Sequence, residues 1–307
     1  MIAFLFPGQG SQYPGMGQQL VDNFPEARRV FDEASDALGF DMAELCFRGS
    51  EDDLRMTANT QPAILTTSIA ALRVLEQETG LSPAYAAGHS LGEFSALVAV
   101  GALGFADAVR TVRQRGTFMQ EAVPVGVGAM AAIMGVEREI LEIICQQASA
   151  DEIVSPANFN SPGQIVIAGH AVAVERAITL AKEQGAKRAM LLPVSAPFHS
   201  ALMQPAAKRL AEVLIALEIG QFRCPVVGNV EALIYTVPER VKPLLVQQVC
   251  APVRWDESVL EMDRLGVKRY VEIGPGKVLC GLVKRIVRGS ETAQVDSVDT
   301  LAQLVDC

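Results

Sequence analysis

The sequence has few aromatic residues and few histidines. Aromatic side chains make up 6% of the 307 residues, with Trp255 as the single tryptophan, and there are three histidines. Half of the residues are apolar and 20% are charged, so the chain can build a large core in one large or two smaller domains. Because small residues dominate, the composition favours helices packed on a parallel sheet over a β-sandwich. We therefore start from an α/β fold.

An excess of positive charge is also lacking. The formal net charge is -9, and no long run of lysine or arginine occurs. Proteins that bind nucleic acid carry a basic patch or stripe, so we expect no nucleic-acid partner.

The sequence also lacks closely spaced cysteine pairs and a segment that resembles a leader peptide. There is no C-x-x-C pair and no histidine at metal-ligand spacing, so we expect no metal site and reduced thiols. The N-terminus lacks a basic region, and its apolar run stops at Pro7, too short for a signal peptide or membrane span. We expect a cytoplasmic protein without a membrane partner. The scattered cysteines are Cys46, Cys145, Cys224, Cys250, Cys280 and Cys307.

Apolar runs and helical periodicity alternate through the first part of the chain. They predict strands at 2–6 and 85–88 and helices at about 24–38, 61–79 and 105–121. Pro62 falls in the first turn of the second of these helices, where proline is tolerated. A further helix is expected to begin directly after Ser90.

Residues 127–195 have a different pattern, which reads strand, helix, strand, strand, helix, strand. That order is typical of the ferredoxin-like unit, in which two helices cover one face of a four-stranded antiparallel sheet. After about residue 200, helices and short strands alternate again. We predict a large α/β subdomain from residues 1–126 and 196–307, with a ferredoxin-like small subdomain inserted at 127–195.

The segment at 88–92, Gly-His-Ser-Leu-Gly, matches the G-x-S-x-G nucleophile elbow. A predicted strand precedes it and a predicted helix follows, as that motif requires. The two glycines permit a sharp turn that exposes the Ser90 hydroxyl and lets the backbone N–H of Leu91 face a developing oxyanion. The alternative is a serine-capped helix in which Glu93 completes a capping box.

A serine nucleophile needs a base, and the histidines are His89, His170 and His199. His89 lies inside the tight turn, so its ring should point away from the hydroxyl. His170 ends an apolar strand and reads as a structural residue. His199 lies in the irregular segment 195–200, where the chain returns to the main domain, and is the best candidate; the alternative is a surface histidine.

The acid of a hydrolase triad has no obvious candidate before His199, between about residues 160 and 198. A backbone carbonyl or an amide side chain could orient the imidazole instead. We therefore predict a serine–histidine dyad.

The glycine-rich loop after the first strand does not read as a nucleotide loop. It has no G-K-[ST], and Tyr13 replaces the third glycine of G-x-G-x-x-G. Gly8 and Gly10 instead flank Gln9, whose backbone N–H could serve as a second oxyanion donor beside that of Leu91. The alternative is an ordinary strand–loop turn.

Arg115 falls on the buried flank of the helix predicted at 105–121. It follows Val112 by three residues and precedes Met119 by four, and both belong to the apolar face. A buried guanidinium requires a carboxylate, supplied either by the protein as an ion pair or by a substrate. The sequence leaves both open.

Taken together, the motifs resemble the malonyl-CoA:acyl carrier protein transacylase family, and they span essentially the whole chain. The inserted ferredoxin-like unit is also the small subdomain of that family. The motifs are FPGQGSQ at 6–12, TQPA at 60–63, GHSLGE at 88–93, Arg115, NFNSPGQ at 158–164, PFHS at 197–200, QQVCAPVRW at 247–255 and EIGPGKVL at 272–279.

This resemblance implies roles for the catalytic residues. Ser90 would be the nucleophile and His199 the general base and acid. The backbone N–H groups of Gln9 and Leu91 would form the oxyanion hole, and Arg115 would hold the malonyl carboxylate.

Four more residues take roles from the resemblance alone. The main-chain carbonyl of Gln248 would orient the catalytic histidine. Gln61 would line the cleft, and Asn160 would belong to the substrate-binding set. Phe198 looks like the pattern of malonyl-selective polyketide acyltransferases.

The activity implied is a ping-pong transfer of malonyl from malonyl-CoA, through a malonyl-serine ester, to the phosphopantetheine thiol of acyl carrier protein, with no metal or redox cofactor. The pathway would be fatty-acid synthesis, and we expect a monomer. Alternatives are a serine hydrolase, a non-catalytic module that binds carrier protein, a trans-acting polyketide acyltransferase and a malonate decarboxylase subunit.

An acidic carrier protein would need a basic docking patch on this acidic chain. We predict it on a helix at 277–288, whose alternative reading is a solvated helix face. The candidate residues are Lys277, Lys284, Arg285 and Arg288.

Overall fold

The computed structural model describes residues 1–194 and 196–305. Ser195, at the predicted subdomain boundary, and Cys307 lie outside the described residues. The boundaries at 126/127 and 195/196 stay a prediction. No helix in the described part of the chain is long and apolar enough to cross a membrane.

The larger of two sheets has six strands in the order β11-β10-β1-β2-β7-β8. All neighbouring pairs are parallel except β7 and β8. The parallel strands are short and mostly buried, as expected for a sheet covered on both faces. The strands are β1 Ile2–Phe6, β2 Tyr85–Gly88, β7 Val226–Val227, β8 Ile234–Tyr235, β10 Arg269–Ile273 and β11 Glu291–Val295.

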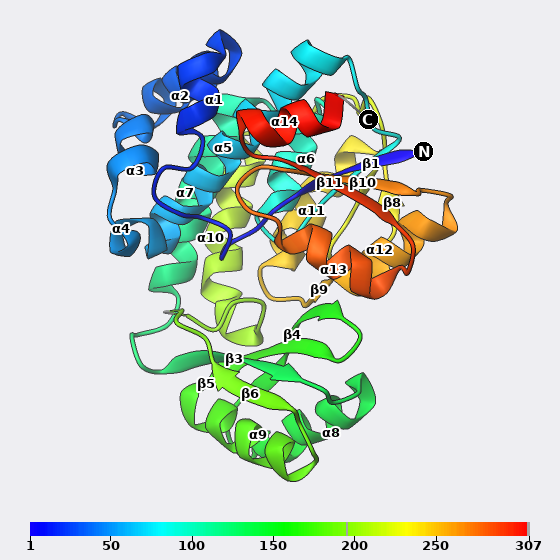
Figure 1. The fold of residues 1–307 in the computed structure, drawn as a ribbon. Helices are drawn as coiled ribbons and strands as arrows, with labels where there is room; N and C mark the ends of the chain where they lie inside the picture. Colours follow the sequence, from blue (N-terminus) through cyan, green and yellow to red (C-terminus); the bar gives the residue numbers. More distant parts are fainter. Residues whose placement is uncertain (195, 306–307) are drawn as a thin grey trace.

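Helices cover this sheet and build most of the main core (Figure 1). Those that precede the inserted unit are α1 Gln18–Asn23, α2 Pro25–Leu38, α3 Met42–Arg48, α4 Glu51–Arg55, α5 Thr57–Thr79, α6 Gly92–Ala99 and α7 Phe105–Glu121. Those that follow it are η1 Ala201–Met203, α10 Gln204–Ile215, α11 Pro238–Gln248, α12 Trp255–Arg264, α13 Val278–Ile286 and α14 Val298–Val305.

Two helix predictions were wrong in extent. Helix α5 begins at Thr57, four residues before the predicted start, so Pro62 lies inside the helix. The extra turn is held by packing, because Gly116 on α7 lies directly against the backbone of Thr57 and Ala58. Helix α13 spans 278–286 and is shorter than the predicted 277–288.

The second sheet confirms the predicted ferredoxin-like unit. Figure 1 shows it as the lower lobe, with α8 and α9 on the face turned away from the rest of the molecule. Its four expected strands gain a fifth, β9, which pairs in parallel with β4 and comes from the returning chain. Its elements are β3 Gly128–Met134, α8 Arg138–Ser149, β4 Val154–Ser161, β5 Gln164–His170, α9 Ala171–Glu183, β6 Arg188–Leu191 and β9 Val253–Arg254.

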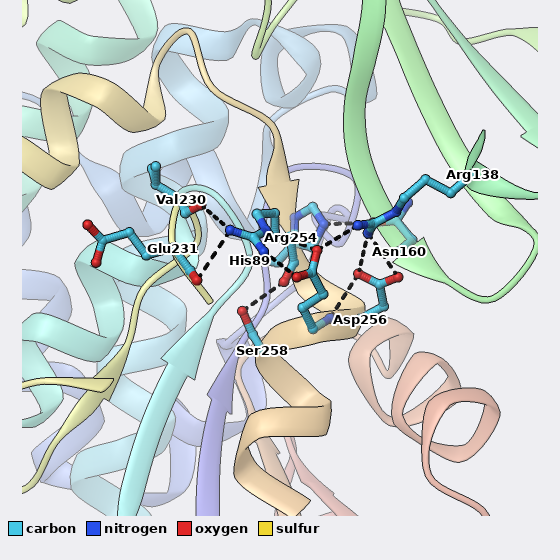
Figure 2. A network of polar contacts seen from close by, with 9 residues as sticks. His89, Arg138, Asn160, Val230, Glu231, Arg254, Asp256 and Ser258 are labelled. Carbon is cyan, nitrogen blue, oxygen red and sulfur yellow. Dashed lines mark hydrogen bonds and ion pairs between the residues drawn. The ribbon is translucent and has the colours of Figure 1, made fainter. Parts of the chain in front are cut away.

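Ion pairs reinforce the junction between this lobe and the large sheet (Figure 2). Arg138, at the start of α8, donates to Glu257 at 2.7 Å and to Asp256 at 3.2 Å, both in the first turn of α12. Its guanidinium also lies 3.7 Å from the centre of the Phe159 ring on β4. The junction holds β4 beside the start of α12, and β4 also carries Asn160, whose Oδ1 lies 2.9 Å from Nε2 of His89 in the elbow.

Candidate active site

Ser90 occupies a sharp turn between β2 and α6. Its φ of 51° is in the left-handed region. Glycines make the turn possible: a Cβ on Gly88 would come within 1.9 Å of the Gly92 backbone, and one on Gly92 within 2.1 Å of the Phe6 carbonyl oxygen. The backbone N–H of Ser90 donates to Asn229 Oδ1 at 2.6 Å. The turn therefore presents the hydroxyl of Ser90 while its own N–H is already occupied.

The structure brings Ser90 and His199 together. Ser90 Oγ lies 2.8 Å from His199 Nε2, and His199 Nδ1 lies 2.8 Å from the main-chain oxygen of Gln248 and 3.2 Å from that of Ala251. Carbonyl oxygens only accept hydrogen bonds, so Nδ1 carries the proton and Nε2 is free to accept the serine proton. No acid is needed to fix this tautomer.

Burial and the nearby charge of Arg115 lower the pKa of His199 to about 3, although the carbonyls of Gln248 and Ala251 oppose the shift. The imidazole is therefore neutral at pH 7, the state that a general base requires.

This pKa gives a pH prediction. The rate of serine acylation should stay flat from about pH 7.5 to pH 5, because His199 does not protonate in that range. Protonation would favour the unfolded chain, whose histidine has a pKa near 6.5, so acid lowers stability before it titrates the folded base. Single-turnover acylation measured alongside the melting temperature tests this; half-loss of the rate near pH 6.5 in folded protein would contradict it.

The rings of the other two histidines make no hydrogen bond with Ser90. His89 Nε2 lies 2.9 Å from Asn160 Oδ1, and its ring packs against Trp255 with centroids 5.7 Å apart. His170 Nδ1 accepts from the backbone N–H of Ile153 at 2.9 Å.

The capping-box alternative is wrong, because Glu93 turns inward. Its Oε1 accepts from the Tyr235 hydroxyl at 2.8 Å, and its Oε2 accepts from the backbone N–H of Asn229 at 3.1 Å and from Gln248 Nε2 at 2.8 Å. Helix α6 has no side-chain cap. The glutamate thus belongs to the buried support behind the elbow.

Arg115 lies on α7, 1% exposed, beside the nucleophile. Its Nη1 donates to Gln61 Oε1 at 2.8 Å, and its Nη2 donates to Gln248 Oε1 at 2.9 Å and to Ser90 Oγ at 3.2 Å. Within the described residues it makes no ion pair, and its Nε has no hydrogen-bond partner. Burial lowers its pKa to about 10, so it remains charged at pH 7. The site therefore holds a cation whose direct hydrogen-bond partners are two glutamine amides and the Ser90 hydroxyl, all of them uncharged.

Two backbone donors face the elbow region. The loop that carries Gln9 is pressed against the turn: a Cβ on Gly8 would lie 2.3 Å from the His89 carbonyl oxygen, and the His89 N–H donates to the Phe6 oxygen at 3.0 Å. Among the described residues, the N–H groups of Gln9 and Leu91 have no protein acceptor. Both are available to an oxygen of a ligand.

Two cavities flank these groups. One, of about 700 Å³, lies between the first loop and the small sheet; Gln9, His89, Asn160, Gln164 and Leu282 are among its lining residues. The other, of about 430 Å³, is lined by His199, Phe159 and Cys250 among others. His199 thus lies on the wall of the smaller cavity, and Gln9 and His89, the residue before the nucleophile, lie on the wall of the larger one.

Of the remaining predicted residues, Gln61 lies deep against Arg115, and Asn160 is tied to His89 at the cavity wall. Phe198 is 7% exposed and packs in the main core.

Sequence reasoning missed Asn229 and the inward role of Glu93. Asn229 also donates from Nδ2 to the Gly88 carbonyl oxygen at 2.7 Å, so it braces both sides of the turn. The available signal was its position two residues after β7, which neighbours β2, because the carboxyl ends of parallel strands meet at one edge of a sheet. Among the described residues, no group of three or more His, Cys, Asp or Glu side chains could hold a metal.

Comparison with known proteins gives the family. Residues 3–303 match the family described as acyl transferase domain. Malonyl CoA-acyl carrier protein transacylases of Bacillus subtilis and Escherichia coli K12 are each 52% identical, over 98% and 93% of this chain and 95% and 93% of theirs.

Solved structures of similar proteins point to the same family. An acyl carrier protein S-malonyltransferase from Vibrio cholerae superposes with a TM-score of 0.96 at 49% identity, covering 99% of both chains. A malonyl-transacylase in complex with a type II PKS acyl-carrier protein gives 0.97 at 48% identity, again over 99% of both chains. These matches confirm the resemblance drawn from the motifs and the expected α/β architecture. The chain is an acyltransferase and belongs to the malonyl CoA-acyl carrier protein transacylase family.

Proposed function

We propose that this acyltransferase moves a malonyl group from malonyl-CoA to the phosphopantetheine thiol of acyl carrier protein, for fatty-acid synthesis. One observation carries the proposal: a serine–histidine pair at 2.8 Å lies beside a buried arginine that, among the described residues, makes no ion pair with a carboxylate. The pair supplies acyl transfer, and the arginine selects an acyl group with a free carboxylate. The names of the relatives support both parts.

In the first half-reaction, Ser90 Oγ attacks the thioester carbonyl while His199 Nε2 takes the serine proton. The N–H groups of Gln9 and Leu91 stabilise the oxyanion, because both are free of a protein acceptor among the described residues. His199 then returns the proton to the CoA sulfur, and CoA leaves a malonyl ester on Ser90.

In the second half-reaction, the carrier-protein thiol gives its proton to His199 and attacks the ester. The same N–H groups hold the second oxyanion, and Ser90 regains its proton as malonyl leaves on the new thioester. The 700 Å³ cavity, with Asn160 and Gln164 on its wall, would hold the pantetheine arm in both steps.

Arg115 would hold the free carboxylate of the malonyl group, with Gln61 and Gln248 keeping the guanidinium in place. Nη2 lies 3.2 Å from Ser90 Oγ, so an acyl group on Ser90 starts within reach of it. Charge-assisted bonds of this kind are strong when water is excluded. We propose Phe198 as a further contributor to malonyl selectivity, through its place beside His199.

Arg115→Ala should therefore lower malonyl transfer selectively. We expect kcat/KM for malonyl-CoA to fall about a hundredfold, and that for acetyl-CoA, which carries no carboxylate, to change much less. The ratio of the two constants is the measurement. Matching losses for both donors, together with a lower melting temperature, would show a structural arginine; Arg113→Ala, on the same helix, is the matched control.

A basic docking surface for carrier protein fits the outer side of α13. Lys277, Lys284, Arg285 and Arg288 are all exposed, while Leu279 and Leu282 of the same segment line the large cavity. Arg285 donates to Gln164 on the small sheet at 2.5 Å, so the segment borders the cavity mouth. Arg288 lies past the end of the helix.

Charge reversal at Lys284 and Arg288 tests this surface. We expect the KM for carrier protein to rise about tenfold at low salt and its salt dependence to weaken, because steering by opposite charge is lost. The half-reaction with malonyl-CoA should be unchanged. Reversal of Lys208 on α10 and Lys242 on α11, away from this segment, is the control. Unaltered carrier-protein kinetics in the test variant would place docking elsewhere.

The proposed function also includes a cellular location and an oligomeric state. We propose a cytoplasmic enzyme, since five cysteines are free thiols.

We also propose a monomer, because one chain supplies Ser90, His199, Arg115 and Gln248. Light scattering of the purified protein tests the oligomeric state, and a stable dimer would contradict the proposed monomer.

A further inference from the structure

Glu93 is a buried carboxylate that the proposed mechanism leaves without a role. It is 1% exposed and lies three residues after the nucleophile. Its three donors are the Tyr235 hydroxyl, the Asn229 backbone N–H and the Gln248 amide, at 2.8 to 3.1 Å. The two N–H donors cannot accept in return, so they favour the negatively charged form of the carboxylate.

The side-chain amide of Gln248 links this carboxylate to Arg115. Gln248 Nε2 donates to Glu93 Oε2 at 2.8 Å, and Gln248 Oε1 accepts from Arg115 Nη2 at 2.9 Å. The opposite orientation would turn the N–H groups toward the guanidinium and the oxygen toward the carboxylate. One buried amide therefore separates an acid from a base and is oriented by both.

The charge of buried Arg115 also needs a negative charge to balance it. A lone buried cation is costly, and within the described residues no carboxylate lies in ion-pair contact with Arg115. Burial raises the pKa of Glu93, while its hydrogen bonds and the Arg115 charge lower it; Glu93 in turn opposes the lowering of the Arg115 pKa by burial. With both groups ionised, the buried pair carries no net charge.

We propose that Glu93 is the counter-charge of Arg115, acts on it through the Gln248 amide, and limits how strongly the site holds a carboxylate-bearing acyl group. The inference rests on the proposed role of Arg115. With malonyl on Ser90, the acyl carboxylate and Glu93 share one guanidinium, and their like charges repel in a buried volume. Glu93 touches no substrate and is a positioning residue. Its effect is to keep the malonyl ester on Ser90 from becoming so stable that transfer to the next thiol is slowed.

Glu93→Gln tests the charge alone. Its amide oxygen can accept from Asn229 and Gln248 while its Nε2 donates to the Tyr235 hydroxyl oxygen, so the hydrogen bonds remain. The measurement is the equilibrium constant for enzyme plus acyl-CoA going to acyl-enzyme plus CoA, from intact-protein mass spectrometry at several acyl-CoA to CoA ratios. We expect the malonyl constant to rise about tenfold and the acetyl constant to stay within about twofold.

Tyr235→Phe is the matched control, because it removes one donor to Glu93 and keeps the charge; both constants should be unchanged. A malonyl constant that is unchanged or lower in Glu93→Gln, or malonyl and acetyl constants that move together, would overturn the inference. Arg115→Ala separates the two proposals. If it does not lower the malonyl constant, the role of Arg115 itself fails, whereas a silent Glu93→Gln beside a sensitive Arg115→Ala defeats only the counter-charge.

A stability cycle covers the case in which Glu93→Gln folds poorly. Glu93→Gln and Arg115→Gln should each lower the melting temperature, since each leaves one buried charge alone. The double variant should lose clearly less than the sum of the two. Strictly additive losses, or a double variant that fails to fold when a single variant folds, would contradict the pairing.

Discussion

Ser90→Ala is expected to abolish formation of the acyl-enzyme and to leave the fold intact. The hydroxyl is the atom that His199 Nε2 contacts at 2.8 Å, so its removal takes away the atom to which the acyl group would be bonded. The turn itself should persist, because its shape depends on Gly88 and Gly92 and on the bond from the Ser90 N–H to Asn229, all of which remain. Intact-protein mass spectrometry after exposure to malonyl-CoA gives the result directly.

Ser95→Ala is the matched control, since Ser95 is a buried serine on α6, the helix that follows the elbow, five residues from Ser90. It should acylate normally. A malonyl adduct of full stoichiometry on the Ser90→Ala protein would show that the nucleophile is another residue.

His199→Ala should lower the rate of acylation by about a hundredfold to ten-thousandfold, the usual range for loss of a general base. A residual rate should survive, because the Gln9 and Leu91 N–H groups and the binding cavity do not depend on the imidazole. Since no titrating base remains, the residual rate should increase with pH as hydroxide takes over the serine proton. Single-turnover acylation with malonyl-CoA measures both effects.

His170→Ala is the control for His199→Ala, because the His170 ring accepts a hydrogen bond from the backbone N–H of Ile153 and makes none with Ser90. Its acylation rate should match that of the unaltered protein. Greater damage from His170→Ala at equal stability would mean that the base was wrongly chosen.

Local signals in the sequence were sufficient for the elements that carry the site. The apolar runs at 2–6 and 85–88, the helix at 105–121 and the order of elements in the inserted unit all appear as predicted. Each is specified by its own periodicity or by turn residues such as Gly88 and Gly92. The buried position of Arg115 followed from the same helical spacing.

The features that sequence reasoning missed depend on contacts between distant segments. The first turn of α5 exists because Gly116 lets α7 approach it, and β9 becomes a fifth strand because the returning chain meets β4. The local sequence pattern around each segment gives no sign of either contact. The two readings of Arg115 likewise stayed open, since only the packed structure shows amides and no contacting carboxylate around it.

The support behind the elbow was hidden for a similar reason. Glu93 fits a capping-box spacing, and nothing within the helix reveals that Tyr235, Asn229 and Gln248 converge on it from more than a hundred residues away. Side-chain networks of this kind are set by the fold and follow no period in the sequence.

The most direct test follows the malonyl group through one complete cycle. The protein is incubated with malonyl-CoA, digested and analysed by mass spectrometry, then a parallel sample receives phosphopantetheinylated carrier protein. We predict a malonyl ester on the peptide containing Ser90, stable in the absence of acceptor, and its stoichiometric transfer to the carrier-protein thiol. No adduct on Ser90, or hydrolysis of the ester to free malonate without acceptor as fast as the ester is lost with acceptor, would contradict acyl transfer through this serine.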